Sequence, residues 1–179
     1  MPLDNFKTLF IAGNLDAPFP SMDFFLKKTY NFLPKPILIQ SVTNSFITLN
    51  KSKYTHVQLL DKEELVDLLR KSELIITHAG VGLTNDCIKN NKKFLLIPRM
   101  PLWREHCDFH QFEWFELIEN LYPEIIKINF TKLDNPKYCE TIVQDTMSSI
   151  NSFNPKILKN YFNSFLLRNA VKSILKRYS

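Results

Sequence analysis

Short apolar runs alternate with amphipathic stretches along the first 150 residues of the chain. Apolar runs of roughly four to eight residues, bounded by Gly, Pro or polar residues, are typical of buried strands. Apolar positions that recur every three to four residues indicate helices instead. The pattern predicts strands at Lys7–Ala12, Pro36–Gln40, His56–Leu60, Leu74–His78, Lys93–Pro98 and Glu124–Ile128.

Helices are expected between these strands. The amphipathic stretches lie at Ser21–Leu33, Lys62–Ser72, Thr84–Asn91, Asp108–Asn120 and Pro136–Ile150. Ser21 is a plausible N-cap of the first, and Asp61 should cap the second with Glu64 at the capping-box position. Such alternation predicts an α/β, Rossmann-like fold: a mostly parallel sheet with helices on both faces.

Charge is distributed unevenly along the chain. The net charge is +5, but residues 155–179 hold six basic side chains and no acidic one. We therefore expect a domain at residues 1–150 and a C-terminal basic amphipathic helix within 151–179. That helix either packs on its own domain or docks on a partner or an anionic membrane. Because the body of the chain has nearly balanced charge, no nucleic-acid partner is expected.

Composition narrows the class further. Hydrophobic residues make up 45% of the chain and charged residues 23%, as in ordinary globular proteins. No apolar run is long enough to span a membrane, and the first 20 residues show no secretory signal. The three cysteines are odd in number and lack a metal-ligand spacing. We expect reduced thiols, a cytoplasmic location, no metal and no cofactor.

The first concentration of unusual residues is "THAGVGLTND", where a strand runs into a helix. Gly80 and Gly82 would let a ligand approach the backbone, and the helix start could receive a diphosphate. A plain tight turn accounts for the glycines equally well. Asp86 could accept hydrogen bonds from ribose hydroxyls, or it is a solvated acid near the helix start. Asn91 sits where a left-handed residue is expected.

The second concentration follows the strand that ends at Pro98. Two arginines, two histidines, a glutamate and a glutamine precede or open the next helix, and such side chains can address phosphate and sugar hydroxyls. Each of them could equally be an ordinary surface side chain. We interpret Trp114 and Phe115 as core residues.

Together these residues carry a resemblance. The stretch "ITHAGVGLTNDCIKNNKKFLLIPRMPLWREHCDFHQFE" resembles the C-terminal domain of family-28 glycosyltransferases, in the small single-domain branch that includes exopolysaccharide and capsule subunits. Weaker likeness extends over about residues 7–130, beginning with the turn at Gly13. Ala79, Leu83 and Lys93 depart from the family pattern, in which glycine, serine and proline stand.

The resemblance implies the C-terminal half of a GT-B glycosyltransferase that binds a UDP-sugar. It implies catalytic roles for His106, the best local candidate for the general base, and Glu105; the base could instead come from a partner. The donor-binding residues that it implies are Gly13, His78, Gly80, Gly82, Thr84, Asp86, Arg99, His110 and Gln111. A metal is not required, because backbone N–H groups and a helix dipole can stabilise the leaving diphosphate.

The resemblance also implies partners. A chain of this length holds only the donor half, so we expect the catalytic subunit of a two-component inverting glycosyltransferase. A membrane-anchored subunit would hold a lipid-linked saccharide acceptor, and this chain would associate peripherally with the cytoplasmic face of the membrane. The alternative is a non-catalytic nucleotide-sugar-binding or scaffold subunit. An unrelated nucleotide-binding domain would leave Glu105-His106 and His110-Gln111 unexplained.

Overall fold

The computed structural model describes residues 5–42, 54–122, 125 and 127–149. Its strands are β1 (Thr8–Ile11), β2 (Ile37–Gln40), β3 (Thr55–Val57), β4 (Leu74–His78) and β5 (Phe94–Ile97). They form one five-stranded sheet in the order β3-β2-β1-β4-β5, and every pairing is parallel. This is the expected Rossmann-like α/β fold. The winding reverses between β1 and β4, and folds of this type bind ligands in the crevice at that point.

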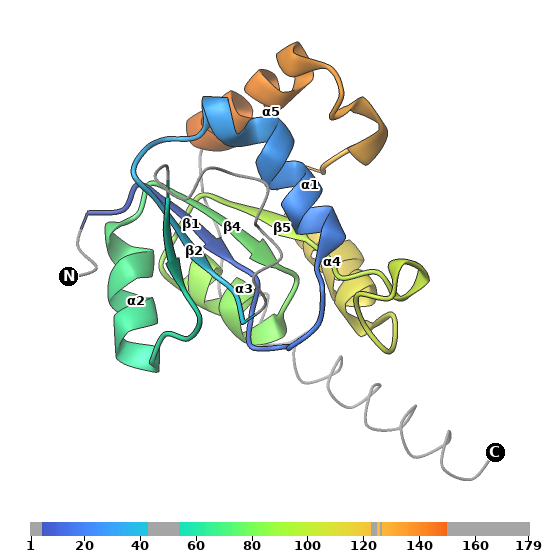
Figure 1. Ribbon diagram of the computed structural model, residues 1–179, viewed down its shortest axis with the longest axis horizontal. Helices are drawn as coiled ribbons and strands as arrows, with labels where there is room; N and C mark the ends of the chain where they lie inside the picture. The colour runs from blue at the N-terminus through green and yellow to red at the C-terminus, as the bar shows by residue number, and fades with distance from the viewer. Residues whose placement is uncertain (1–4, 43–53, 123–124, 126, 150–179) are drawn as a thin grey trace, which may run out of the picture.

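Helices cover both faces of the sheet (Figure 1). The α-helices are α1 (Pro20–Thr29), α2 (Lys62–Lys71), α3 (Val81–Lys89), α4 (His110–Leu121) and α5 (Pro136–Ser148), and short 3₁₀ turns lie at η1 (Tyr30–Phe32), η3 (Pro101–Trp103) and η4 (Phe130–Lys132). Helices α1 and α5 lie on one face, and α2, α3 and α4 lie on the other.

A hydrophobic core lies on each face of the sheet, and successive side chains along a strand pack into one core and then the other. In β1, Leu9 and Ile11 pack with α2, α3 and α4, whereas Phe10 packs with α1 and α5. All four residues of β1 are buried, which is why the strand reads as a continuous apolar run rather than as an alternating one. Trp114 and Phe115 of α4 are buried in the first core, which confirms their interpretation.

Most expected boundaries hold within two residues, and β4 matches its predicted bounds. Asp61 caps α2 in a full capping box with Glu64. Asn91 is left-handed, with φ of 51°. Two helix starts differ from expectation: α1 begins at Pro20, so Ser21 lies inside the helix, and α3 begins at Val81, three residues before Thr84.

The strand expected at Glu124–Ile128 is not present in its described residues. Ile125, Lys127 and Ile128 adopt no strand structure, although both isoleucines are buried. The apolar run there reflects packing on the cores rather than pairing with the sheet. The expected C-terminal helix lies outside the described residues. Within the described part of the chain, no helix is long and apolar enough to cross a membrane.

Candidate functional site

A pocket of about 280 Å³ opens at the carboxyl edge of the sheet, beside the point where the winding reverses. Its walls come from the ends of β1, β2 and β4 and from the start of α3. Leu60, before α2, and Leu65, within α2, complete the lining. The pocket brings together four of the predicted donor-binding residues, namely Gly13, His78, Gly80 and Gly82. A larger open hollow, beside η4 and α5, contains no predicted site residue.

The imidazole of His78 is held between two glycines. A Cβ atom at Gly13 would lie 2.7 Å from His78 Cε1, and one at Gly80 would lie 2.3 Å from His78 Nε2. Both distances are too short for any side chain, and Gly13 also has a positive φ of 84°. The two glycines are therefore required by the ring that they enclose.

His78 is neutral at physiological pH. Burial, opposed in part by a hydrogen bond to Ile11 O and reinforced by the charges of Arg99 and His106, lowers its pKa from 6.5 to about 4. Nδ1 lies 3.3 Å from Ile11 O, so the neutral ring donates its Nδ1–H to that carbonyl and leaves Nε2 as an acceptor. A neutral histidine carries no positive charge that could attract an anion. Backbone N–H groups must therefore provide that attraction in this pocket.

The start of α3 offers such groups. Gly80 is the N-cap and provides no side-chain cap. The N–H groups of Val81, Gly82 and Leu83 therefore have no partner within the helix, and the helix dipole adds positive potential at this end. A Cβ atom at Gly82 would meet nothing within 4 Å, because this position faces open space at the pocket. The helix start is thus shaped to receive an anionic group.

A buried glutamine that was not expected from the sequence lines the pocket and holds two of its loops together. Gln40 ends β2; its Oε1 accepts from Gly13 N–H at 3.1 Å, and its Nε2 donates to Gln58 O at 2.7 Å. The side chain thereby ties the loop after β1 to the chain after β3. The available signal was a polar residue closing the otherwise apolar run "PILIQ".

In the loop after β5, a charged side chain is buried and bonds to backbone groups of the protein itself. Arg99 is 1% exposed, and its guanidinium donates to carbonyls of Ala12, Ala17, Pro18 and Glu105 at 3.1–3.3 Å. It also lies over the ring of Phe19, at 4.2 Å. Burial lowers the pKa of Arg99, although Glu105 opposes the shift. Through these contacts Arg99 joins the loop after β1 to the loop after β5, and a donor-binding role for it stays a prediction.

Glu105 is fully buried and clamps two segments. One carboxylate oxygen accepts from Ser21 N–H at 2.7 Å and from the Ser21 hydroxyl, and the other accepts from Met100 N–H at 2.9 Å. A carboxylate at the start of α1 satisfies an unpaired helix N–H and complements the helix dipole. In this geometry Glu105 positions the start of α1 against the loop after β5, and the catalytic role expected from the sequence stays a prediction.

Three further predicted residues do not line the pocket. Gln111 is 6% exposed, and its Oε1 accepts from Arg99 N–H at 3.2 Å. Thr84 is fully buried, and its hydroxyl donates to Gly80 O within α3. Asp86 is half-buried on α3, and it is not among the lining residues. Gln111 and Thr84 support the neighbouring loops, and a role for Asp86 toward a ribose stays a prediction.

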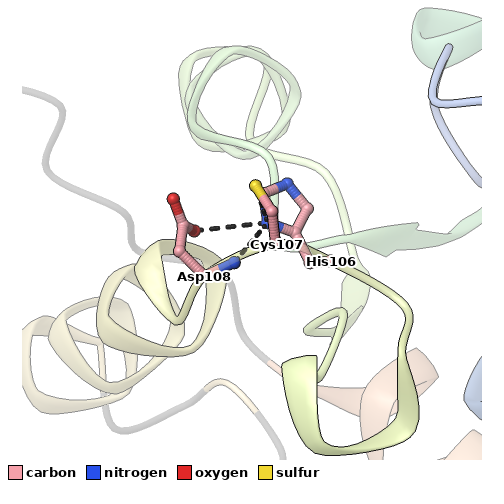
Figure 2. Close-up of side chains that lie close together, drawn as sticks. All are labelled: His106, Cys107 and Asp108. Atoms are coloured by element: carbon pink, nitrogen blue, oxygen red, sulfur yellow. Dashed lines mark hydrogen bonds and ion pairs between the residues drawn. The ribbon is translucent and has the colours of Figure 1, made fainter.

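A cluster of polar side chains lies between η3 and the start of α4 (Figure 2). His106 Nδ1 is 3.2 Å from Asp108 Oδ1 and 3.6 Å from Cys107 Sγ. His110 Nδ1 contacts the same Asp108 oxygen, and the two imidazole rings are 4.4 Å apart. Burial and the neighbouring His110 lower the pKa of His106, against the opposing effect of Asp108. This cluster contains the chain's candidate metal ligands among the described residues.

No known protein-family profile matches the chain. Over 80 residues it is 29% identical to the UDP-N-acetylglucosamine--N-acetylmuramyl-(pentapeptide) pyrophosphoryl-undecaprenol N-acetylglucosamine transferase of Prochlorococcus marinus (strain MIT 9301), a stretch that covers 45% of this chain and 21% of that protein. The relative is named as an N-acetylglucosamine transferase, so the similarity supports the expected likeness to glycosyltransferases coarsely and leaves the single-domain branch a prediction.

Two solved structures are similar at low identity. The glycosyltransferase SnogD from Streptomyces nogalater matches with a TM-score of 0.49 and 12% identity, over 91% of this chain and 44% of that one. The UDP-GlcNAc 2-epimerase from Neisseria meningitidis, solved with UDP-GlcNAc bound, matches with a TM-score of 0.38 and 16% identity, over 92% and 45%. The chain thus spans less than half the length of each of these proteins.

Proposed function

We propose that this chain binds the UDP-sugar donor of an inverting glycosyltransferase in the pocket between β1, β4 and α3. One observation carries the proposal: the start of α3, which no side chain caps, opens into a pocket at the switch point of a Rossmann-like sheet. The volume of about 280 Å³ is close to the lower end of ordinary ligand pockets, about 300–1,000 Å³.

The two ends of a nucleoside diphosphate match the two kinds of wall. The diphosphate would accept hydrogen bonds from the N–H groups of Val81, Gly82 and Leu83. The nucleoside would lie toward the apolar wall of Leu60 and Leu65. The sequence relative is named as a UDP-N-acetylglucosamine-dependent transferase, which supports a UDP-sugar as the ligand class.

Inverting transfer needs a base for the acceptor hydroxyl and a stabilised leaving group. For the leaving group, the start of α3 would stabilise negative charge on the departing diphosphate. For the base, His106 is the best local candidate, because its lowered pKa keeps the ring unprotonated at neutral pH. Nε2 is the basic atom in the tautomer whose Nδ1–H faces Asp108 Oδ1, 3.2 Å away; in the other tautomer Nδ1 accepts from Asp108 N–H at 3.3 Å and Nε2 carries the proton.

Exposed apolar side chains support a partner on this edge of the sheet. Leu15 follows β1, Leu59 follows β3, and Leu102, Trp103 and Phe109 follow β5, and all are 44–77% exposed. Large apolar residues on the strand-end loops of a candidate site are typical of a surface that another domain covers. We propose that a membrane-anchored subunit holding a lipid-linked saccharide docks here, at the cytoplasmic face of the membrane.

The non-catalytic alternative has its own support. Glu105 is committed to Ser21 and Met100, and Leu83 stands where the family pattern has a hydroxyl, so two expected catalytic features are replaced by packing. A scaffold subunit would bind the UDP-sugar at the same pocket without contributing a base. The two functions differ in whether His106 is needed for transfer.

Calorimetric titration with UDP-N-acetylglucosamine and UDP tests donor binding. We expect saturable binding by the wild-type chain and at least about tenfold weaker binding by Gly82→Leu, because the new side chain would occupy the open approach to α3. N-acetylglucosamine, which lacks the diphosphate, should not bind. Equal affinity of both proteins for UDP would overturn the proposed site.

Sugar transfer in the presence of the acceptor-holding subunit tests catalysis and docking. His106→Ala should abolish transfer but keep UDP binding if the chain is catalytic, whereas unchanged transfer would favour the scaffold function. Trp103→Ser should impair transfer by weakening docking. Phe24→Ser, at an exposed position on α1 rather than on a strand-end loop, is the matched control and should leave transfer unchanged.

A further inference from the structure

Four potential metal ligands lie within five residues of the loop before α4. His106, Cys107, Asp108 and His110 offer nitrogen, sulfur and oxygen donors, and the ligand atoms of the first three all lie within 4.8 Å of one another. Figure 2 shows the side chains of His106, Cys107 and Asp108 converging on one space beside the helix. The donors come from a single loop, whose two ends are fixed by Glu105 and by α4.

The spacing of these atoms matches that around a tetrahedral ion. With metal bonds of about 2.0–2.1 Å to nitrogen or oxygen and about 2.3 Å to sulfur, a nitrogen and an oxygen ligand lie about 3.3 Å apart and a nitrogen and a sulfur ligand about 3.6 Å apart. In this loop His106 Nδ1 is 3.2 Å from Asp108 Oδ1 and 3.6 Å from Cys107 Sγ. Two of the three pairs therefore already have the separation of ligands on one ion, and the third, Cys107 Sγ with Asp108 Oδ1, lies within 4.8 Å.

We propose that His106 Nδ1, Cys107 Sγ and Asp108 Oδ1 bind a divalent transition-metal ion of the zinc class. A thiolate and a carboxylate balance its two positive charges, and imidazole with thiolate favours zinc-like ions over magnesium or calcium. His110 is the positioning residue, since its contact with Asp108 orients the carboxylate, as partners of metal ligands commonly do. The fourth position is left for water or an exogenous ligand.

Helix capping is the competing explanation for the cluster. Asp108 Oδ1 accepts from His110 N–H at 3.1 Å, and Asp108 N–H points to His106 Nδ1 at 3.3 Å, an arrangement that orders the start of α4 without an ion. Capping needs only an oxygen acceptor at position 108, however. It gives no role to the exposed thiol of Cys107, and asparagine caps a helix about as well as aspartate does.

The location near a helix start works against a cation. The dipole of α4 disfavours positive charge there by about 0.3–1 kcal/mol. The two anionic ligands oppose this effect, since they make the bound unit neutral. The metal site does not rest on the proposed glycosyltransferase function. The two roles given to His106 exclude each other in one molecule: an ion on Nδ1 places the ring proton on Nε2, so only the metal-free chain could use His106 as a base.

Cobalt(II) titration of the untagged, chelator-stripped full chain under reducing conditions tests the site. A cysteine thiolate on cobalt gives a charge-transfer absorption band, and tetrahedral coordination gives intense d–d bands. We expect both bands to saturate at one ion per chain and to vanish when zinc is added. Cys107→Ser should lose the charge-transfer band, and His110→Ala should bind at least about tenfold more weakly.

Two matched variants separate the explanations. Asp108→Asn keeps an oxygen acceptor for His110 N–H, so it should keep the thermal stability of the wild type while binding cobalt at least about tenfold more weakly. Cys139→Ser removes a buried thiol far along the chain and should leave the spectrum unchanged. A wild-type titration without a saturating charge-transfer band, or an unchanged band in Cys107→Ser, would overturn the proposal.

Discussion

The turn after β4 and the loop after β5 follow neighbouring strands of one sheet, and both contribute to the same sequence resemblance. They differ in where their polar groups point. After β4, the start of α3 has no side-chain cap and opens into a pocket. After β5, Arg99 and Glu105 are buried and bond to the loop after β1 and to the start of α1.

The comparison distinguishes ligand binding from structural support, although both regions belong to one sequence resemblance. The turn after β4 offers backbone donors to a ligand. Arg99 and Glu105 after β5 hold the surrounding loops together. The exposed side chains of that loop are Leu102, Trp103, Arg104, Cys107 and Phe109, and the two histidines are partly exposed. The proposed chemistry therefore depends on the first region for binding and on the second for rigidity, docking and His106.

The largest expected effect is on stability, through the contacts that Glu105 makes with Ser21 and Met100. Glu105→Ala should lower the free energy of unfolding by about 3–5 kcal/mol, because it leaves the buried donors of Ser21 and Met100 without an acceptor and removes the negative charge that favours the buried Arg99 cation. Urea unfolding followed by circular dichroism measures it. Glu116→Ala, at an exposed position on α4, is the control and should change stability by less than about 0.5 kcal/mol. A small loss for Glu105→Ala would restore it as a candidate catalytic group.

A middle-sized effect distinguishes the two glycines of the turn after β4. Gly80→Ala would place Cβ 2.3 Å from His78 Nε2, and the ring cannot retreat because Gly13 lies against its other side. We expect a loss of about 1–3 kcal/mol in the free energy of unfolding. Gly82→Ala meets open space within a helix, so stability should stay the same or rise by up to about 1 kcal/mol. Thermal unfolding of both variants checks the contrast, and equal losses would refute it.

A last effect depends on pH. The pKa of His78 is about 4 in the folded chain against 6.5 for an unperturbed histidine, so the unfolded chain takes up this proton first as pH falls. Its contribution to stability is complete above pH 6.5 and is lost as pH falls toward 4, by at most about 1.4 kcal/mol per pH unit. The difference in unfolding free energy between wild type and His78→Gln should therefore shrink from pH 7 to pH 4. A pH-independent difference would show that folding does not lower the pKa of His78.

Local signals in the sequence predicted the fold well. Asp61 and Glu64 form a capping box within four residues, and the run Leu74–His78 is a buried strand, so nearby residues determine both. Ser21 was misassigned as an N-cap because Pro20 already occupies the first turn, a position that proline favours. The start of α3 was placed too late because Gly82, a poor helix former, lies in its first turn.

The site was predictable only in part, since its decisive contacts join distant residues. The sequence located Gly13, His78 and Gly80 in one pocket, because strand ends of a parallel sheet meet at one edge. It could not show that Glu105 bonds Ser21, 84 residues away, or that Arg99 reaches Ala12. Charged residues in a loop look alike in sequence whether they face solvent or are buried against backbone carbonyls.

Amide-resolved NMR during a UDP titration tests the central claim most directly. If the start of α3 holds the diphosphate, the N–H signals of Val81, Gly82 and Leu83 should show the largest saturable shifts, and those of Met100 and Ser21, which bond to Glu105, should change little. The Gly82→Leu variant should lose the shifts at the same UDP concentration. Saturable shifts centred on the loop after β5, or no saturable shift at α3, would contradict the account.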